Sequence, residues 1–159
     1  MAKIPQVGTP APDFTLPAVT VAGGEATGED LTLSDYRGRT VVLVFYPGDD
    51  TIVCTKQLCS YTSDLEQFTR VDALVWGISP QDIASHESFA RKQSLGFPLL
   101  ADVGKSVIAE YGVSMFGIGV RRSVFVIDGD GIVRWRHVGL AGLNYPDAAT
   151  IAGQIAAIR

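Results

Sequence analysis

The chain contains 159 residues, of which 47% are hydrophobic and 19% charged, and its formal net charge is −4. This length and hydrophobic content are sufficient for one packed core, so we expect a single domain over residues 1–159. The basic residues form no group larger than Arg121-Arg122 and the pair Arg134 and Arg136. Nucleic-acid binding needs a concentrated basic face and is therefore disfavoured as the main function.

Export and membrane insertion are also disfavoured. The N-terminal sequence MAKIPQVGTPAPDF has one lysine and several prolines but no hydrophobic stretch of signal-peptide length. No segment approaches the length of a membrane span. We therefore expect a cytoplasmic protein. In such a reducing compartment the two cysteines, Cys54 and Cys59, are more typical of a catalytic or redox-sensing pair than of a structural disulfide.

The first half of the chain predicts a hairpin, a strand and a helix. DFTL and LTL flank a glycine-rich loop between residues 13 and 33, which predicts a peripheral β-hairpin. TVVLVFY, residues 40–46, is β-branched, aromatic and apolar on both faces, as in a central strand covered on two sides. Apolar residues then recur at helical spacings of three and four: Leu58, Tyr61, Leu65 and Phe68.

The middle of the chain predicts a second buried strand, DALVWGIS at residues 72–79, and a third, SVFVID at residues 123–128. The second strand leads into a helix that has Ser79 as its cap and Pro80 as its first residue and that stops at Gly96.

The remaining elements complete the fold class. Residues 105–112 predict a short helix, and residues 132–138 alternate after a GDG turn, which predicts a hairpin with the third strand. Isoleucines at helical spacing predict a C-terminal helix: Ile151, Ile155 and Ile158. The order of elements predicts an α/β fold in which helices flank a mixed central sheet, with the early hairpin as an N-terminal extension.

The helical face of the first helix places Cys54 in its first turn, four residues before Leu58 and on the core side. The first turn offers unpaired backbone N–H groups and the positive end of the helix dipole, and both favour a thiolate over a thiol. Cys54 is therefore the expected nucleophile.

Cys59 follows five residues later, and helix geometry limits what it can do. In an intact helix the two Cα atoms lie about 140° apart around the axis and roughly 8.6 Å apart. A disulfide needs Cα atoms within about 7 Å. A bond between Cys54 and Cys59 therefore requires the first turn to unwind, which predicts a pair with two structural states.

Other interpretations of the cysteines remain open at this point. They are compatible with two small buried apolar residues. A zinc site needs about four ligands, and His86 and His137 lie in separate predicted elements without ligand spacing. We assign both histidines to the surface or to ordinary core packing. The spacing also differs from the C-x-x-C of dithiol oxidoreductases.

The segment PGDDTIVC is similar to the P-x-x-x-T-x-x-C pattern of the peroxiredoxins, with Pro47, Thr51 and Cys54 in the three fixed positions. The resemblance extends along nearly the whole chain, through VGTPAPDFTL, GISPQDIASHESFA, FPLLAD and RRSVFVIDGDGIVR. Cys59 resembles the resolving cysteine of the bacterioferritin-comigratory or Q-type subfamily. The resemblance implies a thioredoxin-like fold.

The resemblance also implies a mechanism and a set of site residues. Cys54 attacks a hydroperoxide and becomes a sulfenic acid, and Cys59 then forms a disulfide that thioredoxin or a similar dithiol reduces. Thr51 hydrogen-bonds the sulfur or the peroxide, Pro47 shapes the loop and shields the sulfenic acid, and Arg122, in the R-x-x-F context RSVF, stabilises negative charge. No metal, haem or flavin is needed, and both monomers and homodimers occur in the subfamily.

Two assignments have alternatives from the residues themselves. Thr51 is also a good helix N-cap, a role compatible with catalysis. Arg121 rather than Arg122 could face inward, since neighbouring strand residues point to opposite sides, although the motif favours Arg122. The family usually has Pro-Gly, or Pro with another small residue, directly before the reactive cysteine, whereas this chain has Ile52-Val53. These β-branched residues stiffen the loop and add apolar surface, which suggests bulkier organic hydroperoxides as substrates.

Two other functions compete with the two-cysteine peroxidase. One is a one-cysteine peroxidase in which a small thiol resolves the sulfenic acid and Cys59 takes no part. The other is a redox-controlled binding or chaperone module that exposes apolar surface when oxidised. In addition, the apolar residues of YGVSMFGIGV, residues 111–120, are expected in an exposed loop that covers the site or forms a dimer contact.

Overall fold

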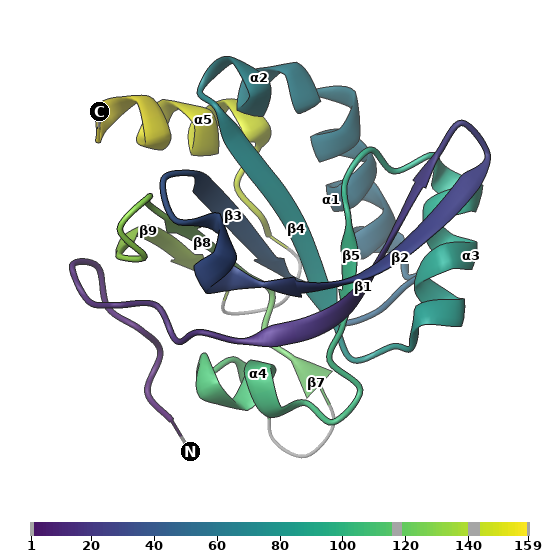
Figure 1. The fold of residues 1–159 in the computed structure, drawn as a ribbon, viewed down its shortest axis with the longest axis horizontal. Helices are drawn as coiled ribbons and strands as arrows, with labels where there is room; N and C mark the ends of the chain where they lie inside the picture. The colour runs from purple at the N-terminus through teal and green to yellow at the C-terminus, as the bar shows by residue number, and fades with distance from the viewer. Residues whose placement is uncertain (1, 116–118, 140–143, 159) are drawn as a thin grey trace.

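A central mixed sheet organises the computed structural model, which describes residues 2–115, 119–139 and 144–158. Its seven strands lie in the order β2-β1-β5-β4-β3-β8-β9 (Figure 1). The neighbours β3, β4 and β5 run parallel, and the outer pairs are antiparallel. The strand bounds are β1 Thr15–Ala22, β2 Glu25–Thr32, β3 Thr40–Phe45, β4 Ala73–Ser79, β5 Leu99–Ala101, β8 Ser123–Ile127 and β9 Val133–Val138. A separate two-stranded ladder joins β6 Ser114–Met115 to β7 Gly119–Val120.

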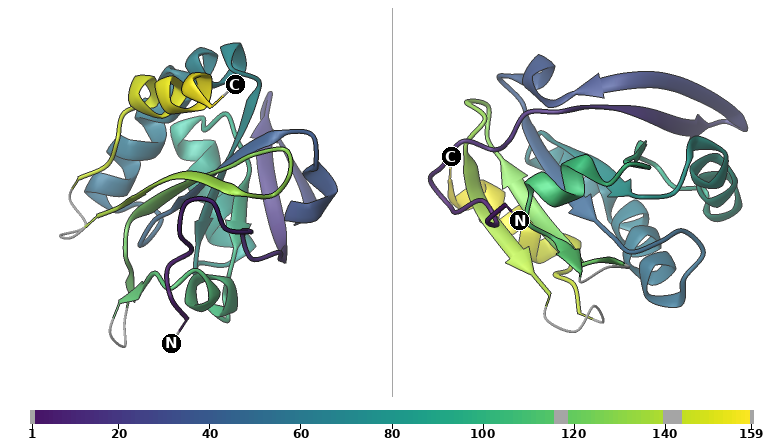
Figure 2. Two further views of the ribbon diagram at one scale, coloured as in Figure 1. Left: turned by 90° about the vertical axis from the view of Figure 1, so that its left-hand side faces the viewer. Right: turned by 90° about the horizontal axis from the view of Figure 1, so that it is seen from below.

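Helices cover both faces of the sheet. Their bounds are α1 Ile52–Ser63, α2 Leu65–Arg70, α3 Ile83–Gln93, α4 Ser106–Glu110 and α5 Ala148–Ala157, with a 3-10 turn at Leu33–Tyr36. Residues of α1, α2, α3 and α5 pack into one core cluster, and residues of α4 and of the N-terminal segment pack into the other. The views at right angles show α1 and α5 on one side of the sheet and the N-terminal segment on the opposite side (Figure 2).

Strand β3 explains why both faces need a cover. All six of its residues are buried. Val42 and Val44 face the cluster of α1, whereas Leu43 and Phe45 face the cluster of α4. This alternation, with apolar side chains at every position, is the pattern of a strand buried on two sides, and it confirms the prediction for residues 40–46.

The predicted elements form, and the first three differences concern the hairpin, the first helix and one strand. The early hairpin turns at Gly23-Gly24, both with positive φ, but it is joined to the main sheet through β1 and β5. The single helix predicted through Phe68 is two helices, α1 and α2, divided at Asp64. The third difference is β5, which the sequence pattern did not predict because it has only three residues and directly follows Pro98.

The start predicted for the third helix was wrong. Helix α3 begins at Ile83, and the carboxylate of Asp82 caps it by accepting a hydrogen bond from Ser85 N at 2.9 Å. A carboxylate is a strong cap, and Ser79 is instead the last residue of β4. At the other end the helix stops slightly earlier than predicted, before Ser94, which adopts the left-handed conformation.

The apolar segment 111–120 is mostly part of the core. Tyr111, Val113 and Val120 are buried, so the prediction of exposed apolar residues was wrong for them. Met115 is 45% exposed, as predicted. Residues 116–118 lie outside the described part of the chain.

Sheet topology brings two distant segments to one edge. The loop after β3 leads into α1, so Cys54 lies beyond the carboxyl end of β3. Strand β8 is antiparallel to β3 and pairs Ser123 with Phe45. Arg122 therefore precedes β8 at the same edge where α1 begins. In open α/β sheets, functional sites gather at the carboxyl ends of the parallel strands.

Gly112 supplies a stability test of this packing. It has φ +67°, and a Cβ there would lie 2.7 Å from Ala2 O and Ile4 N. Gly112→Ala is expected to lower the free energy of unfolding by about 2–4 kcal/mol, through left-handed strain and displacement of the N-terminal segment. Urea denaturation measures it. Gly104→Ala is the matched control, because a Cβ there meets nothing within 4 Å; equal stability of the two variants would contradict the prediction.

Candidate active site

Cys54 lies in the first turn of α1 and its residue is fully buried. The helix has Thr51 at its N-cap position, but among the described residues no side chain caps it. By contrast, Asp82 caps α3 and Asp147 caps α5. The N–H groups at the start of α1 therefore remain available to a negative charge, as the sequence predicted.

A guanidinium group lies directly against the Cys54 sulfur. Arg122 is 2% exposed, and its Nη2 donates a hydrogen bond to Cys54 Sγ at 3.3 Å. Its Nη1 donates to Gln57 Oε1 at 2.5 Å. The inward position of Arg122 agrees with the prediction, whereas Arg121 is only half-buried. A permanent positive charge in this buried position favours the ionised form of the sulfur.

Gln57 holds the arginine and was missed by the sequence reasoning. It is fully buried on α1, and its Nε2 donates to Tyr61 Oη at 3.2 Å. Tyr61 in turn donates to Pro146 O at 2.6 Å, and burial raises the pKa of Tyr61 above its ordinary range, so it remains a donor. The signal was present, because Gln57 lies three residues after Cys54 and therefore on the same helical face.

Cys59 differs from Cys54 in its surroundings. It is half-buried, and its Sγ lies 3.5 Å from Gln93 Oε1 on α3. Burial raises the pKa of the Cys59 thiol, because desolvation disfavours the thiolate. Both cysteines are free thiols. Because both lie inside the continuous helix α1, the separation expected from helix geometry applies, and a disulfide requires unwinding.

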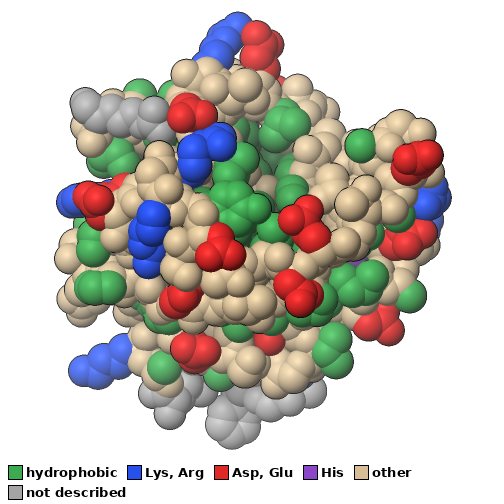
Figure 3. All heavy atoms as spheres, in the orientation of Figure 1, with side chains coloured by type: hydrophobic (Ala, Val, Ile, Leu, Met, Phe, Trp, Pro, Cys, Tyr) green, Lys and Arg blue, Asp and Glu red, His purple; other side chains and the backbone are tan. Residues whose placement is uncertain are grey.

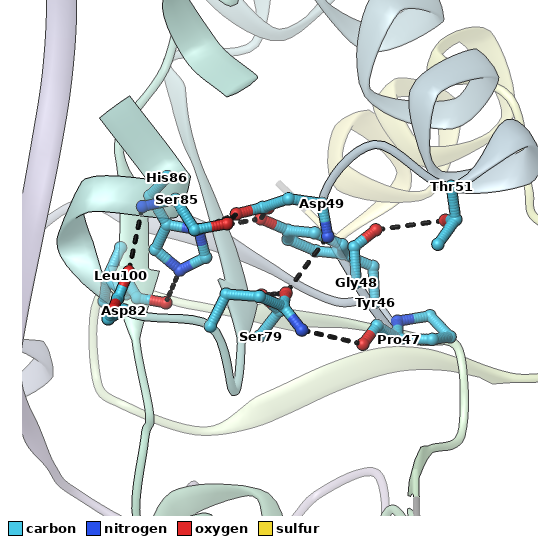
Figure 4. Close-up of polar contacts among 11 residues, drawn as sticks. Tyr46, Pro47, Gly48, Asp49, Thr51, Ser79, Asp82, Ser85, His86 and Leu100 are labelled. Carbon is cyan, nitrogen blue, oxygen red and sulfur yellow. Dashed lines mark hydrogen bonds and ion pairs between the residues drawn. The ribbon is translucent and has the colours of Figure 1, made fainter. Parts of the chain in front are cut away.

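Thr51 and Pro47 lie on the loop that leads into α1 (Figure 4). The Thr51 hydroxyl donates to Gly48 O at 3.0 Å and so tightens the loop. Pro47 O accepts from Gln81 Nε2 at 3.4 Å. The structure therefore brings Cys54 and Arg122 into contact, while the hydroxyl of Thr51 is bound within its own loop.

A buried polar network continues from this loop to α3 (Figure 4). Asp49 Oδ2 lies 2.7 Å from His86 Nδ1, and the side chains are 2% and 0% exposed. Burial alone raises the pKa of Asp49, but the hydrogen bond and charge of His86, with hydrogen bonds from Tyr46 and Ser85, outweigh it and leave the pKa below its ordinary value. His86 is thus a core residue, with polar partners that the sequence did not reveal.

Other candidate sites are separate from Cys54. Among the described residues no group of three or more His, Cys, Asp or Glu side chains is placed to hold a metal ion.

A cavity of about 260 Å³ lies between hairpin β1–β2, α2 and β4, and its lining includes Leu31, Tyr36 and Trp76. On this face hydrophobic side chains gather in a central hollow with charged groups around it (Figure 3). In the described residues no helix is long and apolar enough to cross a membrane.

Known proteins share both the sequence and the fold of this chain. The AhpC/TSA family model matches residues 7–136, and the chain belongs to this family. Within it, the predicted similarity to the bacterioferritin-comigratory and Q-type peroxiredoxins is confirmed by curated relatives. A putative peroxiredoxin bcp of Coxiella burnetii is 38% identical over 146 residues, which cover 86% of this chain and 92% of the relative.

Plant relatives and a solved structure agree. Chloroplastic peroxiredoxin Q of Oryza sativa subsp. japonica is 41% identical, and that of Triticum aestivum 40%, each over 130 residues that cover 80% of this chain. This chain spans only 57% of the length of those two relatives. Reduced 2-Cys peroxiredoxin of Plasmodium vivax superposes with a TM-score of 0.86 at 26% identity, covering 96% of this chain and 81% of that one. The thioredoxin-like fold of the prediction is therefore confirmed.

Proposed function

We propose that the protein is a thiol-dependent peroxidase that reduces hydrogen peroxide and organic hydroperoxides through Cys54. The observation that carries this proposal is the contact between Cys54 Sγ and Arg122 Nη2 at the uncapped start of α1. One buried cation and one helix terminus there act on the same sulfur, and both favour the nucleophilic thiolate. Membership of the AhpC/TSA family supports the same chemistry.

In the first step the Cys54 thiolate attacks one oxygen of the hydroperoxide. A sulfur–oxygen bond forms, the peroxide bond breaks, and the second oxygen leaves, takes up a proton and departs as water or an alcohol. Cys54 becomes a sulfenic acid. Arg122 stabilises the negative charge that moves from sulfur to the leaving oxygen. Thr51, after a change of hydrogen-bond partner from Gly48 O, binds the peroxide, and Pro47 shapes the loop around it.

In the second step the Cys59 sulfur attacks the Cys54 sulfenic acid, and the sulfenic oxygen leaves as water. The product is a disulfide, which an external dithiol such as thioredoxin reduces by thiol–disulfide exchange. Because the raised pKa of Cys59 keeps it protonated, it does not compete for peroxide while the helix is folded. Unwinding of the first turn frees Cys54 to approach Cys59.

This cycle requires a reducing compartment to regenerate the thiols. The free state of both cysteines is compatible with it, and we propose the cytoplasm as the location. The plant relatives themselves are named as chloroplastic proteins. Light scattering distinguishes the two expected assemblies, a monomer and a homodimer.

Mass spectrometry after one equivalent of hydrogen peroxide tests the proposed cycle. We expect a loss of two hydrogen atoms, located in the peptide that contains Cys54 and Cys59, together with loss of peroxide within seconds. Oxidation at the rate of free cysteine would contradict an enzymatic role and favour the redox-controlled binding module. Rapid oxidation that stops at a sulfenic acid would favour the one-cysteine peroxidase.

The residues before Cys54 predict a substrate preference. Ile52 is 77% exposed and lies two residues before Cys54, so it presents apolar surface at the start of the helix that carries the sulfur. We expect Ile52→Ser to lower kcat/KM for a bulky alkyl hydroperoxide by about threefold to tenfold and to leave kcat/KM for hydrogen peroxide unchanged. The loss is smaller than the loss expected for an apolar residue in an enclosed pocket, because Ile52 is exposed to solvent. Steady-state assays with both peroxides measure this ratio. Val103→Ser, at a site 62% exposed, is the control, and a parallel loss with both peroxides would refute the preference.

A further inference from the structure

Both ring nitrogens of His86 face hydrogen-bond acceptors. Its side chain is fully buried, with Nδ1 at 2.7 Å from Asp49 Oδ2 and Nε2 at 3.0 Å from Leu100 O. A carboxylate and a backbone carbonyl only accept, so each ring nitrogen must carry a hydrogen. Asp49 is the ionised partner, because its oxygens also accept from Tyr46 Oη and Ser85 Oγ, each at 2.7 Å. The contact is therefore a buried ion pair.

The pair joins the loop that leads into α1 to helix α3 and, through His86, to strand β5 (Figure 4). Asp49 belongs to the loop between β3 and α1, whereas His86 lies on α3 and Leu100 on β5. A second attachment reinforces it, since Gln81 Oε1 accepts from Asp49 N at 3.0 Å. Charge-assisted hydrogen bonds in a buried site are among the strongest that a loop can make.

The residues that follow Asp49 are held less firmly than Asp49 itself. Asp50 has φ +62°, a conformation that non-glycine residues rarely adopt, and its residue is exposed. Its ion pair with Lys92, at 3.1 Å, joins side chains that are 45% and 59% exposed, and such a pair contributes little. Asp49 is therefore the last residue of the loop whose side chain attaches it to α3 through buried hydrogen bonds, and beyond it the Thr51 hydroxyl bonds within the loop, to Gly48 O.

Tyr46 links the ion pair to the sulfur. Its hydroxyl donates to Asp49 Oδ1, and its ring lies in the same core cluster as Cys54. Burial, followed by the charge of Asp49, raises the pKa of Tyr46 well above its ordinary value, so the hydroxyl remains a donor. Displacement of the Asp49 carboxylate would leave this buried hydroxyl without its acceptor and disturb the packing around Cys54.

We infer that Asp49 and His86 are positioning residues that hold the first turn of α1 folded and so set how often it unwinds to let Cys59 reach Cys54. The inference rests on the proposed peroxidase cycle. Loss of the pair raises the population of the unwound turn. Disulfide formation passes through that minor state and becomes faster, whereas attack on peroxide uses the folded majority and hardly changes.

Hydrogen exchange of the reduced protein tests the anchor without using activity. In His86→Gln we expect the amides of residues 55–57, the first in α1 with helical hydrogen bonds, to exchange about tenfold faster relative to those of β3, the factor for loss of one charge-assisted hydrogen bond. Tyr111→Phe is the matched control, since it removes a buried hydrogen bond, to Pro12 O, on the opposite face of the sheet. An unchanged ratio in His86→Gln, or an equal change in Tyr111→Phe, overturns the inference.

Kinetics supply the second readout. Rapid-quench mass spectrometry should show disulfide formation accelerated about tenfold in His86→Gln, with the rate of Cys54 oxidation within about twofold of wild type. A structural role alone would lower global stability without changing the ratio of these two rates. A wild-type protein that consumes no peroxide refutes the proposed function, and the exchange experiment still decides whether the pair anchors the turn.

Two milder variants cover the case in which His86→Gln does not fold. Asp49→Asn keeps the volume of the side chain and removes its charge, and Ser85→Ala removes only one of the hydrogen bonds to Asp49 Oδ2. We expect faster amide exchange in the first turn of α1 and faster disulfide formation in both variants. For Ser85→Ala the effect should be about threefold, in keeping with one ordinary hydrogen bond. A slower disulfide step in either variant overturns the inference.

Discussion

Replacing Arg122 with glutamine is expected to lower kcat/KM for hydrogen peroxide by about 100-fold to 1000-fold, the range found when one preorganised charge-stabilising donor is removed. Arg122 is the group in hydrogen-bond contact with Cys54 Sγ, and it is almost completely buried, so solvent screens its charge little. The loss of Arg122 acts twice, because the Cys54 sulfur loses its buried cation and the leaving oxygen loses a hydrogen-bond donor. Stopped-flow peroxide consumption measures the rate constant.

The neighbouring arginine supplies the control for this prediction. Arg121 precedes Arg122 in the same segment but is only half-buried. Arg121→Gln is expected to change the rate constant by less than about twofold, as is usual for a charge exposed to solvent. In Arg122→Gln the introduced amide is still a hydrogen-bond donor, and circular dichroism checks that the variant folds. A rate constant for peroxide consumption in Arg122→Gln that equals that of wild type would contradict the prediction.

Replacing Cys59 with serine is expected to leave oxidation of Cys54 unchanged but to lower dithiol-dependent turnover by at least about 100-fold. The reason is effective concentration, since a thiol on the same helix reacts far more readily, once the turn unwinds, than an external thiol at millimolar concentration. The sulfenic acid then persists and is oxidised further to a sulfinic acid by excess peroxide. Intact-protein mass spectrometry distinguishes these species.

Thr55→Ser is the matched control for Cys59→Ser. Thr55 also lies on α1, and its hydroxyl donates to Thr51 O at 2.7 Å, a bond that serine can retain. Turnover should remain close to wild type in this variant. Full dithiol-dependent turnover in Cys59→Ser would show that a small external thiol resolves Cys54 and would support the one-cysteine alternative.

Strands β3, β4 and β8 were predictable because each is a continuous apolar run, and the structure buries such runs on both faces. Strand β5 was not predictable, since three residues give no periodicity. The break between α1 and α2 was also not predictable, because the sequence pattern is continuous across it. Leu58, Tyr61, Leu65 and Phe68 keep helical spacing across Asp64, so the apolar pattern does not record the interruption.

At the site, the motif placed Cys54, Thr51 and Pro47 on a loop and a helix start, and it selected Arg122 over Arg121. The contact of Arg122 with Cys54 depends on the antiparallel pairing of β8 with β3, which joins segments 68 residues apart in the chain. Gln57 was visible as a neighbour on the helical face of Cys54. The role of His86 was not, because nothing local relates it to Asp49, 37 residues earlier.

By itself the sequence determined the order of the main elements, the position of both cysteines on one helix, and thereby the need for that helix to open before they join. These properties follow from local periodicity and from the fixed dimensions of an α-helix. Only the tertiary structure decided which charges surround them: Arg122 at the sulfur and the Asp49–His86 pair behind the loop. Burial makes isolated charges costly, so their partners are chosen by packing between distant segments, which no local pattern specifies.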